Sequence, residues 1–383
     1  MNRRTPLLMV VLGLLLIVLA LLLPRESHAA IPVAGPGDVL LDEAPRPSNA
    51  YCLLCHAQAG QTWKLPSGET VSLTIDASVL AKSVHGDTSS KGPLTCADCH
   101  GNFRYPHPVQ TAQSLRQFTL TRYASCRNCH EDQYTRSQDS VHGAALRAGR
   151  PEAAVCVDCH GGHDIQPPDR PRERISLTCG RCHGAIFDQY RNSVHGKALF
   201  TENNPDVPTC IDCHGVHNIQ NPTTAAFRVR SPEVCSKCHS DGALMAKYKL
   251  NTHIQESYLT DFHGSTVALF EQQDPKIPTN KAVCFDCHGV HNIQPVNNGN
   301  TSPIRENLLT TCRQCHPDAK ANFPDAWIGH YPATPESHPV LYAVNGFYSL
   351  AIPGSIGLVV IVAGADFFRR LRQRFSRRRQ TGA

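Results

Sequence analysis

The sequence has no basic surplus outside its two ends. The formal net charge is +5, but seven arginines and one aspartate lie from Asp366 onward, and three arginines and one glutamate lie in the first 29 residues. The long region between them is therefore acidic, by about three charges. Nucleic-acid binding needs a clustered basic surface, so this distribution excludes it as the function.

The sequence also has no cysteine to spare and almost no methionine. It contains 18 cysteines and 3 methionines, and beyond the first 29 residues only Met245 remains. Every cysteine belongs to one of nine C-x-x-C-H motifs. The motif cysteines are Cys52, Cys55, Cys96, Cys99, Cys126, Cys129, Cys156, Cys159, Cys179, Cys182, Cys210, Cys213, Cys235, Cys238, Cys284, Cys287, Cys312 and Cys315. The motif histidines are His56, His100, His130, His160, His183, His214, His239, His288 and His316.

C-x-x-C-H is the attachment motif of c-type haem. The two cysteines form thioethers to the haem, and the histidine binds the iron from one side. A zinc ribbon or a disulfide framework would also use paired cysteines, but neither needs a histidine directly after every second cysteine. The sequence therefore predicts nine covalently bound haem c groups.

The motifs alternate between two types. Odd-type motifs begin at Cys52, Cys126, Cys179, Cys235 and Cys312, and each is followed by a stretch that supplies a further histidine. Even-type motifs begin at Cys96, Cys156, Cys210 and Cys284; each has an aspartate before the second cysteine and another histidine soon after Cys-His-Gly. One odd and one even unit form an internal repeat of about 55–75 residues, which predicts an architecture built by stacking.

The residues between the motif cysteines differ in charge. Odd-type motifs carry Arg127, Arg181, Lys237 and Arg313, whereas even-type motifs carry Asp98, Asp158, Asp212 and Asp286. Two interpretations remain open. The charges either alternate the haem potentials along the chain, or they are ordinary paired surface charges that contribute little.

Histidine is the expected second iron ligand. Methionine, the other common one, raises the reduction potential, and at least eight irons cannot have it because only Met245 is left. The sequence therefore predicts a low-potential array in which two histidines bind each iron. The candidate second ligands are His85, His142 and His195, each in Ser-Val-His-Gly; His107, His163, His217 and His291 after even-type motifs; His253 or His263; and His330 or His338.

A second histidine cannot serve the haem of its own motif. If the segment from His183 to His195 is helical, these histidines lie roughly 18 Å apart along the axis, at about 1.5 Å per residue. His214 and His217 would point the same way on a helical turn, whereas two axial ligands approach an iron from opposite sides. Each spare histidine therefore ligates a neighbouring haem, and the haems form a compact, mutually bridged array.

The predicted fold is mainly α with extensive irregular loops and few or no strands. About 310 residues serve nine haems, too few to build an aliphatic core around each, so the haems themselves form the core. We expect a nonahaem cytochrome c domain over residues 51–340, preceded by a proline- and glycine-rich linker at 30–50.

The two ends of the chain predict export and a membrane anchor. Residues 1–29 read as a signal peptide, or alternatively as an uncleaved anchor. Residues 341–368 predict a transmembrane helix, followed by a basic tail at 369–383 that the positive-inside rule places in the cytoplasm. The haem domain would then lie on the periplasmic or extracytoplasmic side of the cytoplasmic membrane. His338 and Asn345, just before the membrane edge, could meet a quinol headgroup, though packing or haem ligation also fits them.

Residues 51–331 resemble the multihaem c-type cytochromes, a group that includes the small tetrahaem cytochromes and the NapC/NirT quinol dehydrogenases. The resemblance rests on the nine C-x-x-C-H motifs and on the Ser-x-His-Gly and Cys-His-Gly-x-His contexts. It implies closely spaced haems that relay electrons. The chain departs from NapC/NirT in its C-terminal anchor and its larger number of haems. No motif ends in lysine, as the active-site haem of multihaem nitrite reductases would require.

Two functions are consistent with these features. The first is electron relay between a membrane quinol-oxidising or cytochrome b-type subunit, or the quinol pool, and periplasmic or extracellular redox partners. The alternative is a multihaem reductase or oxidase of a small nitrogen or sulfur compound at one open haem. We assign no catalytic residue, because the candidate histidines are numerous enough to close every iron.

Overall fold

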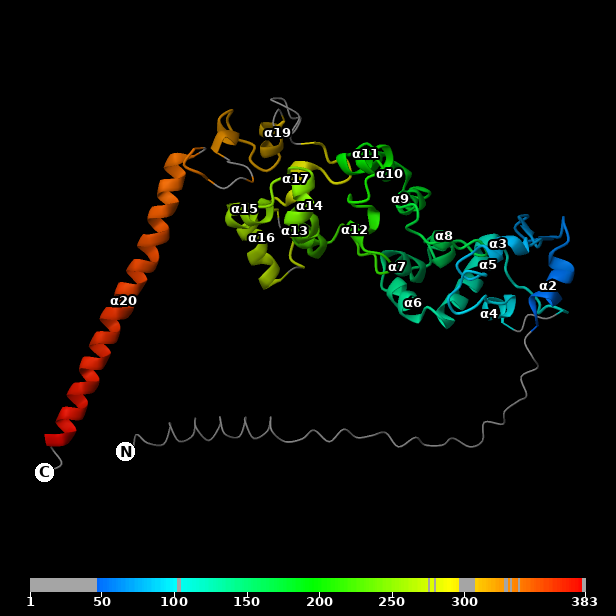
Figure 1. The fold of residues 1–383 in the computed structure, drawn as a ribbon, viewed down its shortest axis with the longest axis horizontal. Coiled ribbons are helices and arrows are strands. Elements are labelled where there is room, and N and C mark those ends of the chain that lie inside the picture. Colours follow the sequence, from blue (N-terminus) through cyan, green and yellow to red (C-terminus); the bar gives the residue numbers. More distant parts are fainter. Residues whose placement is uncertain are drawn as a thin grey trace. The chain divides into compact units, whose positions relative to one another are not determined.

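The computed structural model describes residues 47–101, 105–274, 276–278, 280–295, 307–326, 330, 333–336 and 338–380. The chain divides into two units, Met1–Arg46 and Pro47–Ala383 (Figure 1). The expected signal peptide and most of the expected linker lie outside the described residues. The second unit contains all nine motifs.

This unit is mostly helical with long irregular loops, so the predicted fold class is confirmed. The only strands in the described residues, β1 (Thr62–Lys64) and β2 (Thr70–Ser72), form an antiparallel hairpin with Trp63 opposite Val71. In chain order the helices are α2 (Asn49–His56), α3 (Ala77–Ala81), α4 (Cys96–His100), α5 (Leu115–Arg122), η1 (Tyr123–Asn128), α6 (Glu131–Gln138), α7 (Val141–Arg147), α8 (Cys156–His160), α9 (Glu173–Gly180), α10 (Gly184–Arg191), α11 (Val194–Thr201), α12 (Cys210–His214), α13 (Ala225–His239), α14 (Gly242–Lys247), α15 (Ile254–Thr260), α16 (Phe262–Gln273), α17 (Cys284–His288), α19 (Leu308–Arg313), η2 (Phe323–Ala326) and α20 (Pro339–Gln380).

Each even-type motif is itself a short helix. Helices α4, α8, α12 and α17 begin at the first motif cysteine and end at the motif histidine. The motif aspartate accepts the backbone N–H of the residue that precedes the helix, at 2.6 Å for Thr209 and Asp212. This bond satisfies an N–H that the helix itself leaves unpaired. A glycine with positive φ follows, such as Gly215 at 80°, where other residues are strained, and it turns the chain toward the next histidine.

After the middle odd-type motifs the chain forms two helices that meet at a corner. The segment from His183 to His195 is not one helix: α10 ends at Arg191 and α11 begins at Val194. The physical reason is Ser193, whose Oγ accepts the Gly196 N–H at 3.1 Å and so starts a new helix. A Cβ at Gly196 would lie 2.0 Å from the Tyr190 carbonyl oxygen, so only glycine permits this close approach.

The aliphatic core of the described unit is small. Its one cluster of buried side chains comprises Val229, Val267 and Val283, with Phe285 packed against it. Val229 belongs to α13, Val267 to α16 and Phe285 to α17, and Val283 directly precedes α17, so the cluster supports the motif at Cys284. All 18 cysteines are free, and the structure contains no disulfide framework.

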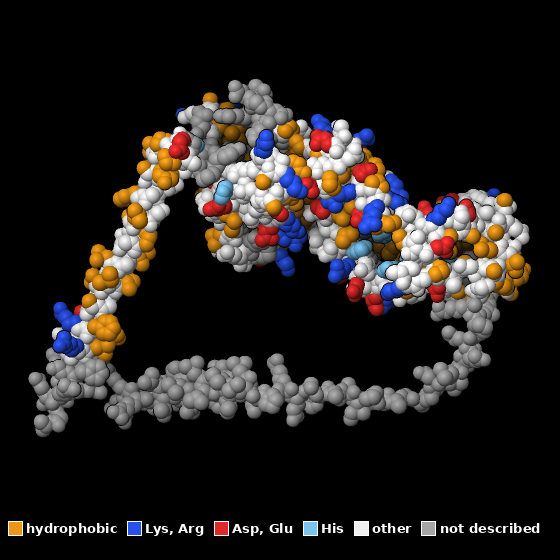
Figure 2. Space-filling view, in the orientation of Figure 1, with side chains coloured by type: hydrophobic (Ala, Val, Ile, Leu, Met, Phe, Trp, Pro, Cys, Tyr) orange, Lys and Arg blue, Asp and Glu red, His pale blue; other side chains and the backbone are white. Residues whose placement is uncertain are grey.

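Helix α20 is long and apolar enough to cross a membrane. Within its segment Pro339–Gln373 an 18-residue window has a mean hydropathy of 1.9, and hydrophobic side chains cover the helix while Lys and Arg side chains gather at one end (Figure 2). Pro353 lies inside the helix without ending it. The helix also extends into the predicted tail, as far as Gln380.

Candidate haem sites

The structure places a histidine from elsewhere in the chain close to every motif histidine. The ring centroids of the nine pairs lie 5.9–6.3 Å apart. With the motif histidine first, the pairs are His56 and His107, His100 and His163, His130 and His85, His160 and His217, His183 and His142, His214 and His291, His239 and His195, His288 and His330, and His316 and His263.

The spacing of these rings fits two axial ligands of one metal. A histidine nitrogen lies about 2 Å from the metal that it binds and roughly 1 Å from the centre of its own ring, so the centres of two opposed rings should be about 6 Å apart. Two aromatic rings in direct contact can also lie at such a distance. Contact alone, however, would not join one motif histidine to one other histidine in all nine cases. The residues present therefore fit bis-histidine haem iron.

The pairs follow a rule of direction. The histidine after an odd-type motif faces the next odd-type motif, as His142 faces His183. The histidine after an even-type motif faces the preceding even-type motif, as His217 faces His160. The two ends of the series are exceptions, because each joins an odd-type motif to an even-type one. His107, after the even-type motif at Cys96, faces His56, and His330, after the odd-type motif at Cys312, faces His288. In none of the nine pairs does a histidine face its own motif.

The structure separates the candidates that the sequence left open. His263 faces His316, whereas the exposed His253 instead places its Nδ1 2.9 Å from Glu256 Oε2. His330 faces His288, and His338 lies directly before α20. Among the described residues His253 and His338 belong to none of the nine pairs, so the geometry favours His263 and His330 as ligands.

Consecutive motifs lie next to one another along the whole series. Helix α2 contacts α4, η1 contacts both α4 and α8, α9 contacts α12, α13 contacts α12 and α17, and α17 contacts α19. Between α8 and α9, the Arg181 guanidinium donates to the Asp158 carbonyl. The nine sites thus form one continuous series in sequence order.

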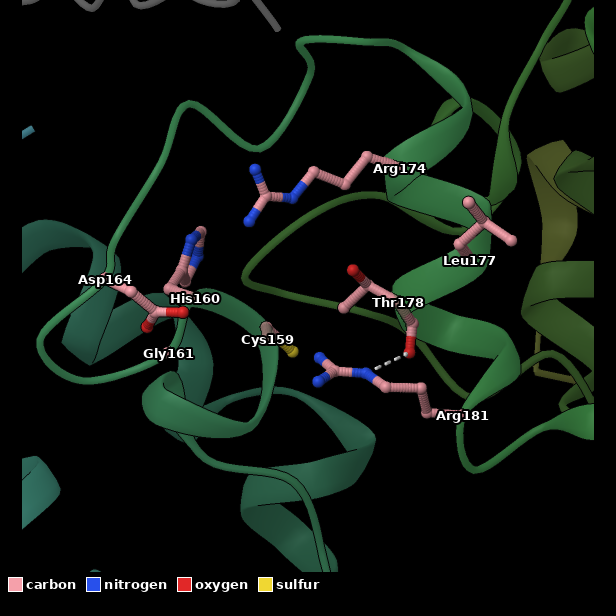
Figure 3. A pocket seen from close by; sticks show the side chains of 8 residues that line it. All are labelled: Cys159, His160, Gly161, Asp164, Arg174, Leu177, Thr178 and Arg181. Atoms are coloured by element: carbon pink, nitrogen blue, oxygen red, sulfur yellow. Dashed lines mark hydrogen bonds between the residues drawn. The ribbon is translucent and has the colours of Figure 1, made fainter. Parts of the chain in front are cut away.

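A cavity beside the motif at Cys156 has a lining that can be compared with the chemistry of a haem. It has a volume of about 440 Å³. Figure 3 shows Cys159 and His160 on one side and Arg174, Leu177 and Arg181 of the α9 segment on the other. A haem presents an apolar ring and two carboxylates; Leu177 suits the ring, and the guanidinium groups suit the carboxylates. The chemistry of this cavity therefore fits a haem attached to the motif.

Three even-type motifs are held by an arginine that the sequence analysis missed. Arg228 donates to both carboxylate oxygens of Asp286, at 3.0 and 2.7 Å, and both side chains are half-buried. The equivalent pairs are Arg116 with Asp158 and Arg172 with Asp212. Charge-assisted bonds of this kind are stronger than neutral ones. The equal spacing of Arg116, Arg172 and Arg228 along the sequence is the pattern that could have revealed them.

The basic residues inside odd-type motifs do not bind these aspartate carboxylates. Arg127 pairs with Glu131 at 2.9 Å, and both side chains are exposed. Arg313 donates to the Ala319 carbonyl oxygen at 2.9 Å. For Arg127 the contact favours the interpretation as a surface ion pair, which contributes little to stability.

Burial favours the neutral form of several of the paired imidazoles. It lowers the pKa of His195 to about 4, with a smaller contribution from the charge of the facing His239. Burial is also the main cause of the lowered pKa of His239, His160 and His214. The neutral imidazole is the form that binds a metal. Within the described residues no group of three or more His, Cys, Asp or Glu is arranged to hold a metal ion.

Repeated C-x-x-C-H motifs, each with a second histidine opposite the motif histidine, are the features of a multihaem c-type cytochrome. Residues 151–240, which contain the motifs at Cys156, Cys179, Cys210 and Cys235, match the family model of cytochrome c3. The match supports that class and implies covalently bound haem c used in electron transfer. The comparison with solved structures found no match.

Proposed function

We propose that the chain is a membrane-anchored nonahaem cytochrome c that relays electrons between a membrane oxidoreductase or the quinol pool and acceptors outside the cytoplasm. The observation that carries the proposal is the set of nine facing histidine pairs, one for each C-x-x-C-H motif. Haem c, when bound, supplies a reversible one-electron centre. An iron with two histidines has no position left for a substrate, which favours relay over the reductase or oxidase alternative.

The residues of the chain set the properties of this relay. Histidine on both sides, with methionine excluded at nearly every site, keeps the potentials low. The capped even-type helices and their arginine–aspartate pairs hold the cysteines and the motif histidine in fixed geometry. The contacts from α2 to α19, with the Arg181 bond to Asp158 between α8 and α9, support a path that follows sequence order and whose last motif, at Cys312, is the one before α20 in the sequence.

The membrane placement is part of the proposal. Helix α20 would anchor the protein, with Arg369, Arg370 and Arg372 on the cytoplasmic side and the haem domain outside. The proposed donor is a quinol-oxidising or cytochrome b-type subunit in the membrane, and the proposed acceptors are periplasmic or extracellular redox proteins. His338 and Asn345, at the start of α20, are the positions where a quinol headgroup would meet the chain.

The haem content and the coordination of the irons test the relay. The mature protein should carry nine covalent haems per chain, measured by pyridine haemochrome assay against protein mass. All irons should be low-spin, and the reduced protein should not bind carbon monoxide. One reduced haem per chain that binds carbon monoxide would instead indicate the open site of an enzyme.

Removal of residues 339–383 tests the anchor. Without α20 we expect the haem domain to move from the membrane to the soluble extracytoplasmic fraction with its haem content unchanged, because all nine motifs precede the helix. A chain ending at Gln380 keeps the whole helix and is the control. A truncated protein that stays in the membrane would contradict the assignment of α20 as the anchor.

A further inference from the structure

Three backbone hydrogen bonds recur between loops that are distant in sequence. The valine N–H of each Ser-Val-His-Gly segment donates to an isoleucine carbonyl in a His-x-Ile-Gln segment. The pairs are Val84 with Ile165 at 2.8 Å, Val141 with Ile219 at 2.9 Å, and Val194 with Ile293 at 2.9 Å.

Each bond joins the segments that carry two of the facing histidines. In the second case Val141 directly precedes His142, which faces His183, and Ile219 lies two residues after His217, which faces His160. The first bond joins the segments of His85 and His163, and the third joins those of His195 and His291. The two histidines that a bond joins always serve consecutive motifs, an even-type motif and the odd-type motif after it.

Local structure leaves the valine N–H free for this contact. Val141 and Val194 are the first residues of α7 and α11, and a first helical residue has no partner for its N–H within the helix. Ser140 and Ser193 cap these helices through the glycine N–H, at 3.1 Å in both cases, and leave the valine N–H to the isoleucine. The Ser-Val-His-Gly segment and the His-x-Ile-Gln segment are thereby fixed to each other, and each carries a histidine that faces one of two consecutive motifs.

We propose that these valine–isoleucine bonds position the second iron ligands in pairs, so that the motifs at Cys96 and Cys126, Cys156 and Cys179, and Cys210 and Cys235 each gain or lose their distal histidines together. The inference rests on the proposed bis-histidine ligation and goes beyond it. Ligand exchange at one haem is then coupled to its neighbour through the backbone. Val141 and its equivalents are positioning residues, because each acts through the histidine that follows it in the chain.

The substitution Val141→Pro removes this N–H with little other change. Proline is well tolerated as the first residue of a helix, and Ser140 already has the extended backbone, φ −80° and ψ 166°, that a residue before proline prefers. Val141→Ala is the matched control, because it trims the same side chain and keeps the N–H. Both are compared in the full-length, haem-loaded protein.

We expect Val141→Pro to contain two high-spin irons per chain, to bind two carbon monoxide molecules when reduced, and to return to low spin when free imidazole is added. Val141→Ala should stay low-spin, and His142→Gly or His217→Gly should open one iron each. Val84→Pro and Val194→Pro test the other two bonds in the same way and serve if Val141→Pro does not accumulate.

Two results would overturn the inference. One is a proline variant with no more high-spin iron than its alanine control; the other is a proline variant that opens a single iron. A failure of the proposed function gives a different result, since the unmodified protein would then carry fewer than nine haems or bind carbon monoxide itself. The two failures are therefore distinguishable in one set of samples.

Discussion

At the scale of single residues, the surroundings of a histidine decide whether it faces a motif. His263 is the second residue of α16, and Asp261 accepts its backbone N–H at 2.6 Å, which fixes the first turn of that helix. Its ring faces His316. His253 lies before α15, where its ring is exposed and contacts Glu256. The same residue type thus has two different roles within a short stretch of chain.

Substitution of these two histidines separates the roles. His263→Ala should open the iron at Cys312, so that one carbon monoxide binds per reduced chain, because its ring is the one opposite His316. His253→Ala should leave all irons low-spin, because it removes only an exposed contact to Glu256. Carbon monoxide titration followed in the Soret region measures both. The reverse pattern would show that His253 is the ligand.

Arg228 gives a second prediction at this scale. Its guanidinium compensates the half-buried carboxylate of Asp286 beside the motif at Cys284, so Arg228→Gln leaves that carboxylate short of a partner. We expect a loss of about 1–3 kcal/mol in the free energy of unfolding and a lower reduction potential for one haem, since negative charge near iron favours the oxidised state.

Guanidinium chloride unfolding and spectroelectrochemical titration measure these two changes. Arg230→Gln, on the same helix but at an exposed position, is the matched control and should change neither quantity. Equal effects of the two substitutions would mean that only the net charge of the protein matters.

At the scale of elements, the repeated corners between helices set where the odd-type histidines point. A capping residue, a histidine and a glycine recur at each corner, with Ser193, His195 and Gly196 as one example and Asp261, His263 and Gly264 as another. The glycine lets the second helix begin directly against the carbonyl groups that end the first. The histidine, held in the first turn of the second helix, is thereby directed away from its own motif.

The substitution Gly196→Ala tests the corner. The new methyl group would lie 2.0 Å from the Tyr190 carbonyl oxygen, so α11 must shift, at a cost of roughly 1–3 kcal/mol. We expect a lower Tm and partial opening of the iron at Cys235, because His195 moves with α11. Gly242→Ala, at the open first position of α14, is the control and should keep the normal Tm and spin state. An unchanged spin state in Gly196→Ala would contradict the link between corner and ligand.

At the scale of the whole molecule, the chain by itself has little to fold around. Its aliphatic cluster is small, its motif helices α4, α8, α12 and α17 have five residues each, and isolated helices of that length are unstable in water. We therefore expect the haems to supply most of the buried apolar surface. The free energy of folding then depends on covalent haem attachment.

Expression without haem attachment tests this dependence. The haem-free chain should lack cooperative unfolding and show a large loss of helical circular dichroism, whereas the haem-loaded protein should unfold in a defined transition. The truncated chain ending before residue 339 is the suitable sample, because α20 would otherwise contribute helical signal of its own. A haem-free chain that unfolds cooperatively would contradict the idea of a haem core.

Much of this organisation could be predicted from local sequence. The nine motifs, the mainly helical class and the apolar C-terminal helix need only short-range patterns, because C-x-x-C-H and an apolar run are complete within a few residues to a few turns. The single helix expected from His183 to His195 was wrong because the capping effect of Ser193 outweighed the apolar periodicity. The arginines that bind the motif aspartates were missed because each comes from a distant helix.

The sequence by itself determined how many C-x-x-C-H motifs there are, which cysteines and histidines belong to each, and that methionine is too scarce to serve as their second ligand. Only the tertiary structure decided which histidine lies opposite which motif histidine, that His263 and not His253 faces His316, and that the segments of these histidines are joined in pairs by the backbone bonds of Val141 and its equivalents. The physical reason is that a thioether motif is local in the chain. The second ligand must approach from the opposite side of the iron, and a repeating chain can supply it only from another repeat.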